Sequence, residues 1–154
     1  MSLTIPVARM PHAEDIELPA YATPGSAGMD LQAALNDELT IQPGTHAHIP
    51  TGIAIALPTG YEAQVRPRSG LAARHGVTVL NAPGTIDSDY RGEIGVLLVN
   101  LGPNAHIVRR ADRIAQLVVA PIQEAAWWPV AEVSGPDPER GDAERGAGGF
   151  GSTD

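Results

Sequence analysis

Short apolar runs separated by Gly and Pro restrict this chain to an architecture of many short strands. The 154 residues include 17 Gly and 14 Pro. Apolar residues alternate with small or polar ones at 51–58 and 61–68, the pattern of a strand with one buried face. The runs at 94–100 and 113–122 are apolar on both faces, the second with one polar interruption at Gln116, and they predict buried central strands. Frequent turn residues between such runs favour strands over long helices.

Only residues 69–76 indicate a helix, and a short one. Ser69 is expected to cap its start and Gly76 to end it. Shorter strand candidates lie at 77–80, 106–110 and 128–133. The sequence therefore predicts an all-β fold, a distorted jelly-roll β-sandwich or barrel with one short helix and a flexible, Gly-rich C-terminal tail.

Composition excludes several classes of function. The chain has no cysteine, which rules out disulfides, thiolate metal sites and a thiol nucleophile. A net charge of −8 makes duplex nucleic acid a poor partner. We see no signal peptide in MSLTIPVARM and no apolar run near the ~20 residues of a membrane span. A soluble, cytoplasmic protein of one domain is expected, without nucleic-acid or membrane partners.

The last 21 residues differ from the rest in composition. Residues 134–154 are rich in Gly and carry almost nothing apolar, so they cannot bury enough surface to order themselves. We expect 1–133 to form the folded part and 134–154 to be a flexible lid of the same domain. Within RGAGGFG, Arg145 supplies charge and Phe150, the only phenylalanine of the chain, supplies a ring face. A disordered end is the alternative.

The stretch NAPGTIDSDYRGEI at 81–94 combines turn residues with reactive ones. A type II turn with positive φ at Gly84 is expected, followed by Ile86 pointing inward and Asp87 pointing outward. The whole stretch would be a hairpin-like loop on a rigid sheet, a suitable place for a catalytic carboxylate. An isolated Asp in a turn more often caps backbone groups.

Features suited to an anion lie elsewhere in the chain. Arg68 stands beside Ser69 and Gly70, whose N–H groups would be free at a helix start. Gln116 is either a satisfied core amide or a ligand contact, since burying it unpaired would cost roughly 1–3 kcal/mol. Asp30 lies in a small, apolar segment and needs an arginine, a metal or water nearby.

Five segments together resemble a known family. AGMDLQA, RPRSGLA, NAPGTIDSDYRG, RADRIAQLV and RGAGGFGS match, in order, the five motifs of the homotrimeric dUTP pyrophosphatases (dUTPases), and the match spans residues 27–152. The resemblance implies a distorted jelly roll, assembly into a homotrimer with shared active sites, and Mg²⁺ as cofactor. It implies hydrolysis of dUTP to dUMP and pyrophosphate by water attack on the α-phosphorus.

The resemblance also implies residue roles. Asp87 would be the general base that activates the attacking water, and Asp30 would contact metal-bound water rather than the metal. Tyr90 would pack against the deoxyribose and leave no room for a 2′-hydroxyl. Arg113 would hold structure or phosphate. Substrate binding would fall to residues of the second to fifth motifs: Arg68, Ser69, Gly70, Asn81, Gly84, Ile86, Tyr90, Gln116, Arg145, Phe150, Gly151 and Ser152.

Each part of the substrate would then have its own contacts. Asn81 and the 81–90 backbone would read the uracil edge, and Phe150 would stack on the base. Arg145 would hold the terminal phosphate. The remaining phosphate contacts would come from Arg68, Ser69, Gly70 and Gln116.

Two alternatives share the architecture. A dCTP deaminase or bifunctional enzyme would need an added acid/base near the base, and 81–90 holds no glutamate; Glu93 follows it. A non-catalytic dUTP-binding protein would be expected to lack Asp87. His46 and His48 on one strand face read as surface residues, and Trp127 and Trp128 as packing or subunit-contact residues.

Overall fold

The computed structural model describes residues 3–131. The chain divides into two units, Met1–Glu124 and Ala125–Asp154, and each is treated by itself. The expected boundary between residues 133 and 134 lies outside the described residues, as does the whole predicted lid. Among residues 3–131, no helix has the length and hydropathy needed to cross a membrane.

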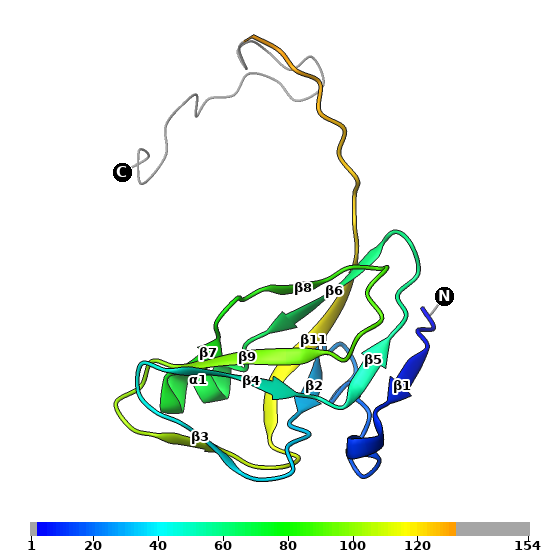
Figure 1. Ribbon diagram of the computed structural model, residues 1–154. Coiled ribbons are helices and arrows are strands. Elements are labelled where there is room, and N and C mark those ends of the chain that lie inside the picture. Colours follow the sequence, from blue (N-terminus) through cyan, green and yellow to red (C-terminus); the bar gives the residue numbers. More distant parts are fainter. Residues whose placement is uncertain (1–2, 132–154) are drawn as a thin grey trace. The chain divides into compact units, whose positions relative to one another are not determined.

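Strands dominate the first unit, which confirms the all-β prediction (Figure 1). Two short helical segments accompany them, the 3₁₀ turn η1 (Pro11–Ala13) and the α-helix α1 (Ser69–His75). The strands in residues 3–131 are β1 (Val7–Arg9), β2 (Met29–Gln32), β3 (Leu39–Ile41), β4 (His46–Pro50), β5 (Ile53–Ile55), β6 (Tyr61–Arg66), β7 (Val77–Val79), β8 (Gly84–Ile86), β9 (Gly95–Asn100), β10 (His106–Val108) and β11 (Arg113–Pro121).

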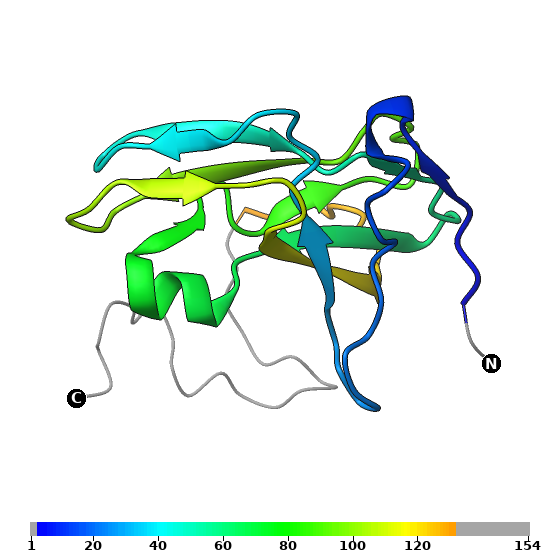
Figure 2. The same cartoon turned by 90° about the horizontal axis from the view of Figure 1, so that it is seen from below.

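The strands form antiparallel sheets. One sheet has the order β2-β11-β6-β8 and another the order β4-β9-β7, while β1 pairs with β5 and β10 with β3. The two strands predicted to be central are central: β9 lies between β4 and β7, and β11 between β2 and β6. Figure 2 shows the sheets stacked in layers, with α1 at one end.

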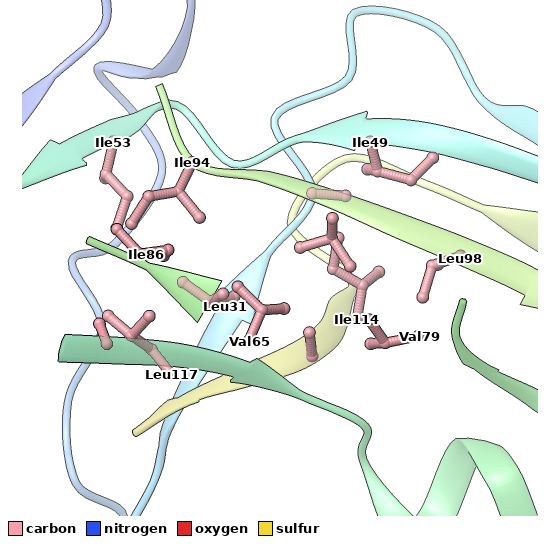
Figure 3. Packing of buried hydrophobic residues seen from close by; sticks show 14 of the residues in the cluster. Leu31, Ile49, Ile53, Val65, Val79, Ile86, Ile94, Leu98, Ile114 and Leu117 are labelled. Atoms are coloured by element: carbon pink, nitrogen blue, oxygen red, sulfur yellow. The ribbon is translucent and has the colours of Figure 1, made fainter. Parts of the chain in front are cut away.

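The core lies between the two larger sheets (Figure 3). Ile49 and Leu98 come from the β4-β9-β7 sheet, and Val65, Ile114 and Leu117 from the facing one. All five are at most 4% exposed. Alternation along each strand sends these side chains to one face, and removing them from water is the main stabilising contribution.

The short helix begins differently from the prediction. α1 starts at Ser69, but the N-cap residue is Arg68 in extended conformation, with no side-chain capping bond. Ser69 as the cap is therefore wrong. Ser69 is itself the first helical residue, and the extended residue before it is Arg68. Gly76 does end the helix, with a left-handed φ of 66° that a residue with a side chain rarely adopts.

The last strand candidate is wrong over its described part. Residues 128–131 form no strand, and 132–133 lie outside the described residues. Trp127 and Trp128 are 93% and 87% exposed. Pro129 removes one backbone donor next to the tryptophans, which weakens strand pairing there.

Candidate active site

Residues 81–94 link the two larger sheets. β8 pairs with β6, whereas β9 pairs with β4 and β7. The hairpin-like prediction is therefore wrong, since β8 within the segment and β9, which follows it, belong to different sheets. Between them the chain turns over 87–90, where the Tyr90 N–H donates to the Asp87 carbonyl at 3.2 Å. The segment forms a corner of the sandwich.

Gly84 is not the positive-φ residue of a type II turn. The Ala82–Pro83 peptide is cis, and Gly84 is absent from the glycines with positive φ. Gly84 is instead the first, buried residue of β8. A Cβ on Gly84 would lie 3.1 Å from the Asn81 side-chain amide, so close approach rather than turn conformation explains the glycine.

A small pocket opens at the corner. It measures about 180 Å³. Ile86 is 8% exposed and points inward as predicted, while Asp87 is exposed. Among residues 3–131, no donor forms a hydrogen bond with the Asp87 carboxylate, which leaves both oxygens available to water. The pocket is lined by Thr85, Ile86, Asp87, Tyr90, Ile94 and Gly95.

Arg68, Asp30 and Arg113 form a second cluster. Arg68 Nε donates to Asp30 Oδ1 at 2.9 Å, and Arg113 Nη1 donates to Asp30 Oδ2 at 3.3 Å. Arg68 Nη1 also donates to the Arg113 carbonyl at 3.0 Å. Of the partners expected for Asp30, an arginine, a metal or water, the arginine is present twice. Two guanidinium groups around one carboxylate leave a local excess of positive charge in a chain of net charge −8.

Gln116 connects this cluster to the sheet. It lies on the central strand β11, level with Asp30 on β2 and Arg66 on β6. Its side-chain NH₂ donates to the Pro67 carbonyl at 2.8 Å, which pairs one of its two N–H bonds. A Cβ on Gly28 would lie 2.6 Å from Gln116 Oε1, which explains a glycine at that position. Gln116 therefore fixes the backbone that leads into Arg68.

Ser69 and Gly70 are the first two residues of α1, directly after Arg68. Ser69 is exposed and Gly70 is half-buried. A Cβ on Gly70 would lie 3.0 Å from the Arg74 guanidinium. The three residues of this predicted phosphate contact are thus contiguous at the end of β6.

The pocket and the arginine cluster lie apart within one chain. Ala63 pairs with Ile86 and Val65 with Gly84, so Asp87 is level with Glu62 at the start of β6. Arg68 follows the end of β6. Six residues of extended chain from 62 to 68 span about 20 Å. One chain therefore forms two separate groups. One contains the predicted phosphate contacts around Arg68, and the other contains Asp87 and Tyr90.

Other predicted residues lie outside both places. Arg145, Phe150, Gly151 and Ser152 fall outside the described residues. His46 and His48 are exposed on β4. The sequence did not predict the contact of Glu93, whose side-chain carboxylate accepts a hydrogen bond from the Gly52 N–H at 2.7 Å. The one indication of this contact in the sequence is the position of an acidic residue directly before a buried strand.

A larger groove of about 520 Å³ holds none of the predicted site residues. It runs past β1, β5 and β11, and Val7 and Tyr21 at its margin are 42% and 54% exposed. An exposed apolar surface of this kind is typical of an interface. It is lined by Leu3, Ile5, Val7, Leu18, Pro19, Tyr21, Met29, Ile53, Ile55, Tyr61, Leu117 and Val119.

Comparison with known proteins gives a consistent result. The dUTPase family profile matches residues 14–154. A deoxyuridine 5′-triphosphate nucleotidohydrolase of Desulfotalea psychrophila is 59% identical over 140 residues, covering 91% of this chain and 89% of that protein. A protein of the same name from a Wolbachia of Drosophila simulans is 51% identical, covering 98% of this chain and 95% of that protein.

Solved structures agree on the fold. The dUTPase of Staphylococcus bacteriophage 80alpha, solved with dUPNHPP, superposes with a TM-score of 0.83 at 24% identity, over 98% of each chain. A mutant dUTPase of Staphylococcus aureus phage phi11, described with a structural Mg(II) ion, gives 0.75 at 22% identity, over 86% of this chain and all of the other. The fold is thus the distorted jelly roll that was predicted. The family profile and these relatives extend over nearly the whole sequence, and the chain belongs to the dUTPase family.

Proposed function

We propose that this protein hydrolyses dUTP to dUMP and pyrophosphate, with Mg²⁺ as cofactor. This would lower dUTP and supply dUMP for thymidylate synthesis. The observation that carries the proposal is Asp87, an exposed carboxylate without a hydrogen-bonded donor among residues 3–131, at the wall of a 180 Å³ pocket. Relatives that are 51–59% identical are named for dUTP hydrolysis.

Asp87 is the proposed general base. Its carboxylate would take a proton from the water that attacks the α-phosphorus, and the pyrophosphate would leave on the opposite side. Tyr90 lines the same pocket and would lie against the deoxyribose. Asn81, Gly84 and Ile86 would complete the contacts to the uracil. The pocket is too small for a whole nucleotide, in agreement with a phosphate chain held elsewhere.

The arginine cluster would hold the phosphate chain. Arg68 keeps Nη2 free of protein acceptors among residues 3–131, and Arg113 is 60% exposed, so both can donate to an anion. Ser69, Gly70 and Gln116 would complete this grip. Phosphoryl transfer depends chiefly on positioning and charge neutralisation, so a cluster of this charge suits the binding of a phosphate chain.

The residues present fit a Mg²⁺ ion held largely by the substrate. Residues 3–131 contain no group of three or more His, Cys, Asp or Glu that could hold a metal ion. Mg²⁺ keeps several waters and is commonly bound through substrate phosphates. Asp30 would accept hydrogen bonds from water on the ion. When bound, the ion would offset phosphate charge.

The site is proposed to form between chains of a homotrimer. The separation of about 20 Å between the backbones of Asp87 and Arg68 along β6 supports a site completed by a second chain. The apolar groove offers surface to bury in such an assembly. A cytoplasmic location and the lack of nucleic-acid or membrane partners remain predictions from the sequence.

The C-terminal segment is proposed to close the site. Arg145 would bind the terminal phosphate, Phe150 would stack on uracil, and Gly151 with Ser152 would add contacts. The support is the sequence of 145–152. Truncation after Gly135 is expected to leave a folded protein with poor turnover, as judged by thermal melting and pyrophosphate release. Turnover equal to that of the full chain would rule out this role.

The contacts of Glu93 favour hydrolysis over the dCTP deaminase alternative. Its carboxylate binds Gly52 and His12, and it is absent from the lining of the pocket. Among residues 3–131, the pocket lining therefore holds no glutamate of the kind that a deaminase would need. A non-catalytic dUTP-binding protein is disfavoured by Asp87.

The deciding experiment measures pyrophosphate release from dUTP, dTTP, dCTP and UTP, each with Mg²⁺ and with EDTA. We expect fast release from dUTP alone and its loss in EDTA. Ammonia from dCTP would establish the deaminase alternative. Tight dUTP binding with no release from any substrate would establish the binding protein.

A further inference from the structure

Glu93 joins the end of the 81–94 segment to two other parts of the fold. Its Oε1 accepts from the Gly52 N–H at 2.7 Å and lies 3.1 Å from His12 Nε2. The Glu93 side chain is 29% exposed, so these bonds are only partly open to water. A carboxylate that accepts a backbone N–H and contacts an imidazole is held in one orientation.

The main chain of Glu93 in turn holds Tyr90. The Tyr90 hydroxyl donates to the Glu93 carbonyl at 2.8 Å. Gly92 lies beneath the ring, where a Cβ would be 2.5 Å from the hydroxyl oxygen and 2.7 Å from Cζ. Tyr90 is 45% exposed, so the bond to the Glu93 carbonyl and the contact with Gly92 both help to hold its ring.

The other side of the contact is also fixed. Arg110 donates to the His12 carbonyl at 2.7 Å and to the Leu35 carbonyl at 2.8 Å. It also donates from Nε to Asp15 at 2.9 Å and lowers the pKa of Asp15 to about 2. Arg110 therefore fixes the backbone of His12, whose ring contacts Glu93. A continuous set of bonds runs from Arg110 through His12 and Glu93 to Tyr90.

We propose that Glu93 is a positioning residue that sets the discrimination between deoxyribose and ribose triphosphates. The inference rests on the proposed dUTP hydrolysis. Tyr90 lines the pocket beside Asp87, and a ring that moves away would open room for a 2′-hydroxyl. The Glu93 carbonyl accepts from the Tyr90 hydroxyl, so loss of the Glu93 side-chain bonds to Gly52 and His12 would let this carbonyl shift and the ring move with it. Glu93 itself does not line the pocket.

The test compares kcat/KM for dUTP with kcat/KM for UTP in the full-length protein. We expect Glu93→Ala to lower the dUTP/UTP ratio by about tenfold, since displacements near 1 Å can change rates by this much or more. Glu93→Gln should restore the ratio, because its amide oxygen still accepts from Gly52. Ile41→Val, a core change on β3, should lower the melting temperature and leave the ratio unchanged.

Two further variants separate positioning from general loss of structure. Gly92→Ala should lower the ratio while the Glu93 side chain keeps its bonds to Gly52 and His12, because the added methyl displaces the Tyr90 ring. In a Tyr90→Ala background, Glu93→Ala should change the ratio no further. An unchanged ratio in Glu93→Ala, with both substrates affected equally, overturns the inference. A wild type that releases pyrophosphate from neither substrate overturns the proposed function, and the inference with it.

Discussion

Asp87 and Arg68 lie at opposite ends of the β6–β8 strand pair. The register sets Asp87 level with Glu62, and Arg68 follows six residues further along the neighbouring strand. Extended chain of that length spans about 20 Å. The carboxylate and the guanidinium therefore extend from backbone positions that are far apart within a single chain. The homotrimer with shared sites proposed above would bring the two groups together from different chains.

Replacement of the proposed base tests the chemical step. Asp87→Asn is expected to lower kcat by at least about 100-fold and to keep dUTP affinity within a few-fold, because the phosphate contacts remain. Single-turnover pyrophosphate release and equilibrium binding measure the two effects. Asp89→Asn, an exposed residue of the same turn, is the matched control. A near-normal kcat in Asp87→Asn would mean that another group is the base.

The arginine cluster makes a prediction about both affinity and stability. Arg68→Lys removes the directed bonds to Asp30 and to the Arg113 carbonyl. We expect KM for dUTP to rise about tenfold and the free energy of unfolding to fall by about 1–2 kcal/mol, since the pair is partly exposed.

Steady-state kinetics and urea denaturation measure the two effects of Arg68→Lys. Arg109→Lys is the control, because Arg109 and its partner Glu38 are 60% and 59% exposed. That change should cost less than about 0.5 kcal/mol. Equal effects of the two substitutions would argue against a special role for Arg68.

Asn100 is a buried polar residue on which one end of the sandwich depends. Its side-chain NH₂ donates to the Ile41 and Asn104 carbonyls at 2.9 and 2.8 Å, and its Oδ1 accepts from the Gly102 N–H at 2.9 Å. Asn100→Ala would leave these backbone groups unpaired and should cost about 3 kcal/mol. Chemical denaturation measures the loss. Asn104→Ala, at an exposed position, should change the free energy of unfolding little. Similar losses for both variants would show that the three hydrogen bonds of Asn100 do not account for the loss of stability.

His106 should make stability depend on pH. Burial, and next the nearby His75, lower the pKa of His106, while Asp112 acts in the opposite direction. The two rings lie 5.1 Å apart between centroids. Because the unfolded chain then binds the proton more readily, the stabilisation is complete above about pH 6.5 and falls as the pH drops toward the folded pKa.

Denaturation midpoints at about pH 5.5 and about pH 7.5 measure this dependence. His106→Gln should reduce the difference between the two midpoints, whereas His46→Gln, an exposed substitution on β4, should not. A His106 ring signal that titrates above its ordinary pKa in NMR would contradict the expected direction.

Local patterns predicted the strands β5, β6, β7, β9, β10 and β11, whereas the roles of the candidate site residues came from the resemblance to a known family. Alternation predicted β5 and β6, and continuous apolar runs predicted the central β9 and β11, because the period of side-chain direction in a strand is two. The same patterns placed Ile86 inward and Asp87 outward. Gly76 was predicted to end the helix because few other residues accept its conformation.

Pairing in space was decided only by the tertiary structure. Nothing in the sequence of 81–94 says that β8 and β9 join different sheets, since strand partners are distant in the chain. The need of Asp30 for a partner could be predicted from the sequence. Its pairing with both Arg68 and Arg113 could not, since it depends on three separate segments meeting in space. The partners of Glu93 could not be predicted, because Gly52 and His12 reach it only when separate segments pack together.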